Sequence, residues 1–178
     1  MIGQASLFDE EPRYCIDTNV IVSFLRGTDD EYYGADVFAP QWRLIEGLMG
    51  SGAMVAPRQV EAELLKWNKT IPAMAPWLKS HRRMFLDVEM SAQLASAKKI
   101  VNIYPAYARD MNYLGDLSVI SLADCLEITV LTLEGRRPGS SQRRPKIPNV
   151  CQEFDIDCVS VSGFLRRERF GERATEGM

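Results

Sequence analysis

RYCIDTNVIVSFLRG, residues 13–27, is the stretch that decides the fold. A short β-prone segment ends at Asp17, and after Asp17, Thr18 and Asn19 the apolar residues return with helical spacing. This change of period predicts a strand before Asp17 and a helix after it that ends at Gly27. Asp17 therefore lies at a strand-to-helix junction, either as a helix cap or as a chemical group held at the edge of the core.

Similar patterns alternate along the rest of the chain. Strands are predicted over residues 53–57, 128–134 and 154–161, and helices over 41–52, 58–69, 91–112 (broken or kinked at Pro105), 116–127 and 162–170. This alternation predicts one α/β domain over residues 13–178, with a mostly parallel central sheet between helical layers, preceded by a flexible acidic arm over 1–12. Ligands of such sheets bind outside the carboxyl ends of the strands, so acids at those ends are the candidates for a site.

Four acids occupy such positions. Asp17 and Glu134 directly follow predicted strands, Asp116 opens the helix that precedes the strand leading to Glu134, and Glu63 lies in the helix after residues 53–57. If the strands are parallel, the four side chains approach the same end of the sheet.

Each acid also has a purely structural explanation. Asp17 and Asp116 are good helix caps, worth about 1 kcal/mol each, and an acid in the loop after a strand, such as Glu134, is commonly only solvated.

Helical wheels test some of these explanations. The wheel of residues 116–127 places Asp116 at the edge of the apolar arc, whereas Asp124 and Ser121 fall on the polar arc. The wheel of the earlier helix does not separate Glu63 from Glu61, because both have apolar neighbours.

Several acids at one end of a sheet need a reason to stay together. Two carboxylates about 5 Å apart, at an effective dielectric constant near 20, repel each other by about 3 kcal/mol. A cation removes this repulsion, and oxygen ligands without His or Cys favour Mg²⁺ or Mn²⁺. An ion held in this way can activate a water and stabilise the leaving oxygen of a phosphodiester.

Charge limits the partners. The net charge is −3, so a polyanion must meet a local basic patch rather than the surface as a whole. Such a patch follows Glu134 in GRRPGSSQRRPK, which carries Arg136, Arg137, Arg143, Arg144 and Lys146. These side chains could guide phosphate into the site, and the stretch is equally explained as a flexible, solvated loop.

Composition sets further limits. No apolar run is long enough to cross a membrane, and the acidic N-terminus does not match a signal peptide. The four cysteines form no CxxC pair, and His81 cannot complete a zinc set with them, so a reduced cytoplasmic protein is expected. Trp42, Trp67 and Trp77 occupy helix-like positions and are expected in the core or in a dimer interface rather than as base-stacking platforms.

Three stretches resemble the motifs of PIN-domain nucleases. YCIDTNVIVSFLRG resembles their opening, where the first strand ends in an Asp followed by Thr or Ser and then Asn or Ser. VAPRQVEAELLKW resembles the second motif, in which an acid directly precedes a leucine, and this selects Glu63 over Glu61. GDLSVISLADCLEITVLTLE resembles the third, with Asp116 starting a helix and Glu134 standing where many members have Asp. The tail, from Lys146 onward, is similar to that of a less characterised branch of PIN-like proteins.

The resemblance implies a PIN-like three-layer α/β/α fold and a metal-dependent endoribonuclease, often the toxin of a VapC-type toxin–antitoxin pair. An RNA substrate, a homodimer and a small antitoxin protein are the implied partners. The implied site holds one or two Mg²⁺ or Mn²⁺ ions through Asp17 and Asp116 directly, and through Glu63 and Glu134 either directly or through water. The side chains expected to orient these carboxylates by hydrogen bonds are Thr18, Asn19, Ser118 and Thr132.

Two alternatives differ in function. A haloacid-dehalogenase-type phosphatase also has an Asp at the end of its first strand, but it needs a second Asp two residues later, where this chain has Asn19. A catalytically inactive PIN-like module that binds RNA or protein would keep the fold. The presence of all four acids argues against that module, while Glu134 in place of Asp argues for it.

Overall fold

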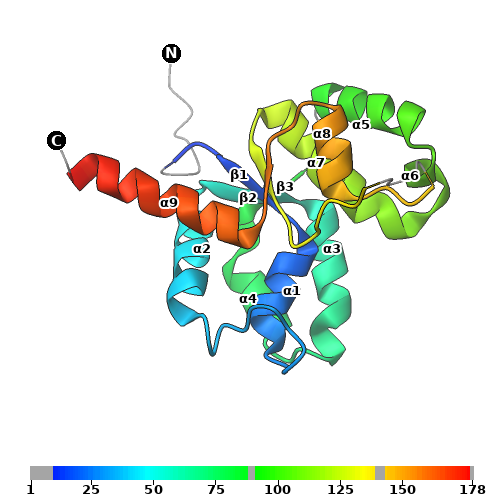
Figure 1. Ribbon diagram of the computed structural model, residues 1–178. Helices are drawn as coiled ribbons and strands as arrows, with labels where there is room; N and C mark the ends of the chain where they lie inside the picture. The colour runs from blue at the N-terminus through cyan, green and yellow to red at the C-terminus, as the bar shows by residue number, and fades with distance from the viewer. Residues whose placement is uncertain (1–9, 88–90, 139–142, 177–178) are drawn as a thin grey trace, which may run out of the picture.

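The computed structural model describes residues 10–87, 91–138 and 143–176. Its centre is a five-stranded sheet in which every pair of neighbouring strands is parallel (Figure 1). The strands are β1 (Tyr14–Ile16), β2 (Met54–Pro57), β3 (Phe85–Leu86), β4 (Thr129–Leu131) and β5 (Cys158–Val159), in the order β3-β2-β1-β4-β5. The predicted α/β fold with a parallel sheet is thereby confirmed.

Helices cover both faces of this sheet and give a three-layer α/β/α arrangement. Figure 1 shows α5 (Ser91–Ile103), α7 (Leu114–Leu126) and α8 (Ile147–Glu153) on one side, and α2 (Ala39–Ser51) and α9 (Val161–Glu176) on the other. α7 packs against β1, β2 and β4, and α5 packs against α7. The other helices are α1 (Thr18–Arg26), α3 (Arg58–Lys66), α4 (Met74–Ser80) and α6 (Ala106–Arg109), with 3₁₀ turns η1 (Trp67–Lys69), η2 (Arg82–Met84) and η3 (Met111–Tyr113).

β1 lies in the middle of the sheet. Its residue Cys15 is paired with Val55 of β2 on one side and with Val130 of β4 on the other. Every residue of β1 and β2 is buried, which explains why these strands read as continuous apolar runs rather than alternating patterns. α1 follows directly and ends at Gly27, whose φ of 62° is the left-handed conformation predicted for a helix stop.

The strand order creates a crevice next to β1. The chain runs outward from β1 through β2 to β3, and then returns to the other side of β1 to form β4 and β5. β1 and β4 therefore flank the point at which the direction of strand addition reverses, where parallel sheets bind their ligands. The residues that follow these two strands, from Asp17 and from Thr132 onward, lie at this crevice.

Two elements, β3 and α8, were not predicted, and the last strand is shorter than predicted. β3 has only two residues, and α8 begins at Ile147, next to Pro148 at a position where proline is compatible with a helix start. The predicted strand 154–161 is reduced to β5, because Asp155 has a φ of 56° and makes a turn.

The structure decides between the two outcomes predicted for Pro105 and corrects one other helix prediction. The predicted helix over 91–112 is broken at Pro105, because α5 ends at Ile103. Ser121, predicted on the polar arc of its helix, is buried because α5 covers that side, and Gln93 Nε2 on α5 donates to its Oγ at 3.4 Å.

The structure bears only in part on the predicted N-terminal arm. Residues 1–9 of the predicted flexible arm lie outside the described residues, and the backbone N–H of Glu10 donates to the carbonyl of Ser51 at 3.0 Å. None of the helices in the described part of the chain is both long and apolar enough to cross a membrane.

Candidate active site

The four candidate acids line one cavity at the carboxyl end of the sheet. The cavity has a volume of about 490 Å³, and its walls include Asp17, Glu63, Asp116 and Glu134. These residues come from the end of β1, from α3, from the first turn of α7 and from the loop after β4. The structure therefore brings together acids that lie far apart in the sequence. We call this space the acid cavity.

Asp17 is buried at the back of the crevice, with 2% of its surface exposed. It occupies the N-cap position of α1, but its side chain makes no capping hydrogen bond. Instead, Thr132 Oγ1 donates to Asp17 Oδ2 at 3.0 Å. Burial raises the pKa of Asp17 to about 7, and the charges of Glu134 and Glu63 add to this shift. Asp17 is therefore the N-cap residue of α1 by position, but its carboxylate bonds to Thr132 rather than capping the helix.

Asp116 has a similar environment. The N-cap residue of α7 is Tyr113, so Asp116 lies inside the first turn and does not cap the helix. Burial raises the pKa of Asp116 to about 8, and the charges of Asp17, Glu134 and Glu63 raise it further, against a smaller opposite effect of Lys146. A cation bound beside such a carboxyl group would favour its charged form and lower its pKa.

The structure distinguishes Glu63 from Glu61, which the helical wheel did not. Thr18 Oγ1 donates to Glu63 Oε2 at 2.7 Å, and a Cβ atom placed on Gly115 would lie only 2.5 Å from Glu63 Cδ. Glu61 faces away from the acid cavity, forms an ion pair with Arg58 at 2.8 Å and lines a different cavity. Glu63 is therefore the acid of the site, and Gly115 provides the room for its carboxylate.

Glu134 is held differently from the other acids. Lys146 Nζ donates to its Oε1 at 2.8 Å, and the backbone N–H of Ile147 donates to its Oε2 at 2.9 Å. The N–H of Glu134 itself donates to Thr132 Oγ1 at 3.1 Å, so Thr132 joins Glu134 to Asp17. Lys146, which the sequence placed in a phosphate-guiding loop, contacts an acid of the site instead.

The four residues expected to orient the carboxylates divide into two groups. Thr18 and Thr132 each donate a hydrogen bond to a site acid, as expected. Asn19 lines the acid cavity and is exposed, without a hydrogen bond to a carboxylate within the described ranges. The prediction for Ser118 is wrong, because its hydroxyl donates to the carbonyl oxygen of Leu114, one turn earlier in α7, at 2.8 Å.

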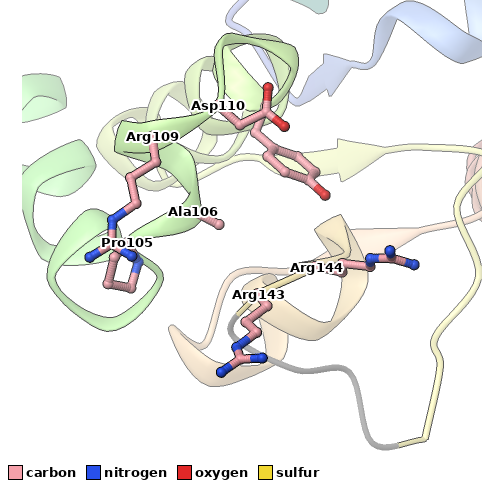
Figure 2. A pocket seen from close by; sticks show the side chains of 7 residues that line it. Pro105, Ala106, Arg109, Asp110, Arg143 and Arg144 are labelled. Carbon is pink, nitrogen blue, oxygen red and sulfur yellow. The ribbon is translucent and has the colours of Figure 1, made fainter.

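Of the four arginines predicted to guide phosphate, two line a cavity and two do not. Arg143 and Arg144 line a second cavity of about 510 Å³ together with Arg109 and Asp110 (Figure 2). Tyr113 lines both this basic cavity and the acid cavity, so the two spaces share a wall. The remaining two predicted residues, Arg136 and Arg137, are exposed and line neither cavity.

Further residues of the acid cavity were not predicted from the sequence. Lys66 and Trp67 line it, three and four residues after Glu63, and this spacing on one helix face was a usable signal. Trp67 is thus a wall of the cavity rather than a core residue, whereas Trp42 and Trp77 are buried as expected. The segment Met111–Tyr113 also lines the cavity. Met111 and Asn112 are the last residues of the helix predicted over 91–112, and Tyr113 directly follows it, so no local pattern marked them as part of a site.

The side chains of the four acids offer only carboxylate oxygens, which are the ligands that Mg²⁺ and Mn²⁺ prefer. No three His, Cys, Asp or Glu side chains of the described ranges are placed to hold a metal ion together. Asp17 and Asp116, however, are sheltered acids that form no ion pair with any described residue. Mg²⁺ commonly takes one or two carboxylates and keeps several waters, so the chemistry of such a site does not require a third ligand from the protein.

A family model described as "Domain of unknown function (DUF4411)" matches residues 14–171. The chain belongs to this family. The match extends from β1 into α9 and includes all four acids of the cavity. No curated protein and no solved structure matches the chain.

Proposed function

We propose that the protein is a metal-dependent endoribonuclease that hydrolyses RNA phosphodiester bonds. The observation that carries this proposal is the convergence of Asp17, Glu63, Asp116 and Glu134 on one cavity at the switch point of the sheet. The three motifs that resemble those of PIN-domain nucleases contribute these same four acids, and the three-layer fold is the one that the resemblance implies.

The acids have distinct tasks in this proposal. Asp17 and Asp116 hold the ion, which when bound lowers the pKa of a water and stabilises charge on the phosphate. Thr132 fixes one oxygen of Asp17, and Thr18 fixes one oxygen of Glu63, so both carboxylates are oriented before substrate arrives. Glu63 orients the attacking water by accepting a hydrogen bond from it.

Substrate contacts are available next to the acids. Arg109, Arg143 and Arg144 surround the basic cavity, and none of them forms an ion pair with the described residues. Trp67 and Tyr113 add aromatic side chains to the acid cavity. Aromatic rings beside free arginines are typical of surfaces that bind single-stranded nucleic acid, with arginine on phosphate and bases stacked on the rings.

The test is cleavage of a labelled RNA by purified protein with Mn²⁺, and with EDTA as the metal-free comparison. Asp17→Asn and Asp116→Asn should each lower the rate by 100-fold or more, because each removes a charged metal ligand. Asp124→Asn is the matched control, since Asp124 lies on the same helix as Asp116 but lines a cavity away from the site. Equal cleavage by wild type and Asp17→Asn would reject the proposed function.

A second candidate is an inactive PIN-like module that binds RNA or protein. It is favoured by Glu134, whose two oxygens are already bound by Lys146 and Ile147. Retained RNA binding without cleavage in Mn²⁺ or Mg²⁺ would support this module. The phosphatase alternative predicts hydrolysis of p-nitrophenyl phosphate, although Asn19 stands where such enzymes need an Asp.

Homodimerisation, a small antitoxin partner and a cytoplasmic location remain predictions of the resemblance and of the sequence. Size-exclusion chromatography with light scattering tests the first, and co-expression with the protein encoded by a neighbouring small reading frame tests the second.

A further inference from the structure

Lys146 is the one basic side chain in the described part of the chain that forms an ion pair with an acid of the acid cavity. Its Nζ is 2.8 Å from Glu134 Oε1, while the N–H of Ile147 occupies Glu134 Oε2 at 2.9 Å. Both oxygens of Glu134 thus have protein donors. The pair is sheltered, with the side chains of Lys146 and Glu134 exposed to 33% and 16%.

Thr132 connects this pair to the proposed metal ligands. Its hydroxyl accepts from the N–H of Glu134 at 3.1 Å and donates to Asp17 Oδ2 at 3.0 Å. Thr132 therefore links the backbone of Glu134 to the carboxylate of Asp17, so a movement of Glu134 would change the orientation of Asp17. The positive charge of Lys146 also lowers the pKa of Asp116, against the larger opposite effects of burial and of the neighbouring carboxylates.

We propose that Lys146, held by Glu134 of the acid-cavity wall, is a built-in second cation beside this cavity, so that the site binds one divalent ion, at Asp17 and Asp116, and not two. Glu134 is then a positioning residue that holds Lys146 and is not a metal ligand. In two-metal sites the second ion supplies positive charge beside the reacting phosphate. Here the ammonium group of Lys146 supplies that charge. This inference rests on the proposed metal centre and specifies its composition.

Isothermal titration calorimetry of the metal-free protein with MnCl₂ tests the composition directly. Wild type should bind one Mn²⁺ per chain. Lys146→Met should bind two, because it removes the ammonium and frees Oε1 of Glu134 to take an ion, while the N–H of Ile147 stays on Oε2. The double variant Lys146→Met with Glu134→Gln should return to one Mn²⁺, with a Kd within about threefold of wild type.

Two controls change charge in the same way outside the site. Lys98→Met removes a lysine from α5, and Arg58→Met with Glu61→Gln removes an ion pair that lines a different cavity. Both controls should bind one Mn²⁺ with the wild-type Kd. The double variant at Lys146 and Glu134 leaves no buried unpaired charge, so it decides whether Glu134 is a ligand even if Lys146→Met alone does not fold.

Three results would overturn the inference: two Mn²⁺ ions on wild type, one on folded Lys146→Met, or a Kd weakened tenfold or more in the double variant. Asp17→Asn separates these from a failure of the proposed function. If Asp17→Asn binds Mn²⁺ as tightly as wild type, the metal centre itself is wrong. If it loses Mn²⁺ while Lys146→Met still binds one ion, only the role of Lys146 is wrong.

Discussion

Gly115 is the residue on which the position of the Glu63 carboxylate depends. A Cβ atom there would collide with the end of the Glu63 side chain, which is flexible and can move away. Alanine also favours a helix over glycine by up to about 1 kcal/mol. Gly115→Ala should therefore fold at least as stably as wild type, yet lose RNA cleavage by on the order of 100-fold, because a displacement of about 1 Å can cost that much.

The matched control is Gly47→Ala. Gly47 also lies inside a helix, α2, and nothing stands within 4 Å of a Cβ atom there. It should gain the same helix stability and keep wild-type kcat/KM. Thermal melts and cleavage kinetics of the two variants measure both quantities. Full activity of Gly115→Ala would show that the position of Glu63 is not required.

Asp17 makes the stability of the metal-free protein depend on pH. Its pKa is about 7 in the folded chain, against about 3.9 for an unfolded Asp, so the folded state holds more protons between these values. The contribution of this group to the free energy of unfolding is full below pH 4 and is lost as the pH rises towards 7. Asp17→Asn removes this loss and should be more stable than wild type at pH 8.

Urea denaturation in EDTA at several pH values measures this effect. The difference in unfolding free energy between Asp17→Asn and wild type should grow from pH 4 to pH 7, by about 1.4 kcal/mol for each unit of pKa shift. Asp124→Asn, outside the acid cavity, serves as the control for the loss of one negative charge. A difference that stays flat across this range would contradict the environment described for Asp17.

The sequence was informative about individual acids to different degrees. Position after a strand or at a helix start was enough to select Asp17, Asp116 and Glu134. Glu63 and Glu61 share a helix with no clear polar face, so only packing against Thr18 and Gly115 could separate them on physical grounds. The contact of Lys146 with Glu134 spans a loop whose path no local pattern specifies, and so it could not be predicted.

At the scale of elements, the side chain of Phe164 packs α9 against the sheet. The side chain of Phe164 is fully buried, and its ring meets that of Tyr14 edge to face, with the centroids 5.0 Å apart. Phe164→Ala should lower the free energy of unfolding by about 3–5 kcal/mol, as for other large core truncations. Urea denaturation measures this loss.

The same variant separates stability from function, since none of the described side chains of α9, up to residue 169, lines the acid cavity. At a temperature where Phe164→Ala is still folded, it should cleave RNA at the wild-type rate. Phe164→Leu, which keeps an apolar side chain, should cost less. A large loss of kcat/KM in folded Phe164→Ala would mean that α9 positions the site.

The elements that sequence patterns predicted well are those with a clear period and a clear end. β1 and α1 are one example, because the period changes at Asp17 and Gly27 ends the helix. β3 was missed because two residues carry no period, and α8 was missed because it is short and directly follows a stretch rich in Pro and Arg. Ser121 was misplaced because a wheel assumes one solvent face, and α7 packs between the sheet and α5.

At the scale of the whole molecule, binding of the proposed ion should be visible as stability. Mn²⁺ at about 100 times its Kd should add about 2.7 kcal/mol to the free energy of unfolding, or about 5–10 °C in Tm for a chain of this size. The gain should be larger at pH 8 than at pH 5, because protons compete for Asp17 and Asp116, whose pKa values are about 7 and about 8.

Differential scanning fluorimetry with and without Mn²⁺, and again after EDTA, measures this gain. EDTA should reverse it, and Asp17→Asn should not show it. An equal rise in Tm at both pH values, or a rise that persists in Asp17→Asn, would place the bound ion outside the acid cavity.

The central position of β1 has a consequence for how the protein is made. β1 and its partner β4 are separated by more than a hundred residues, so β4 is synthesised much later than β1, and the crevice between them does not exist until both are present. Contacts between such distant segments also form slowly. For the proposed ribonuclease, this order of synthesis means that the nascent chain cannot cleave RNA until β4 has been made.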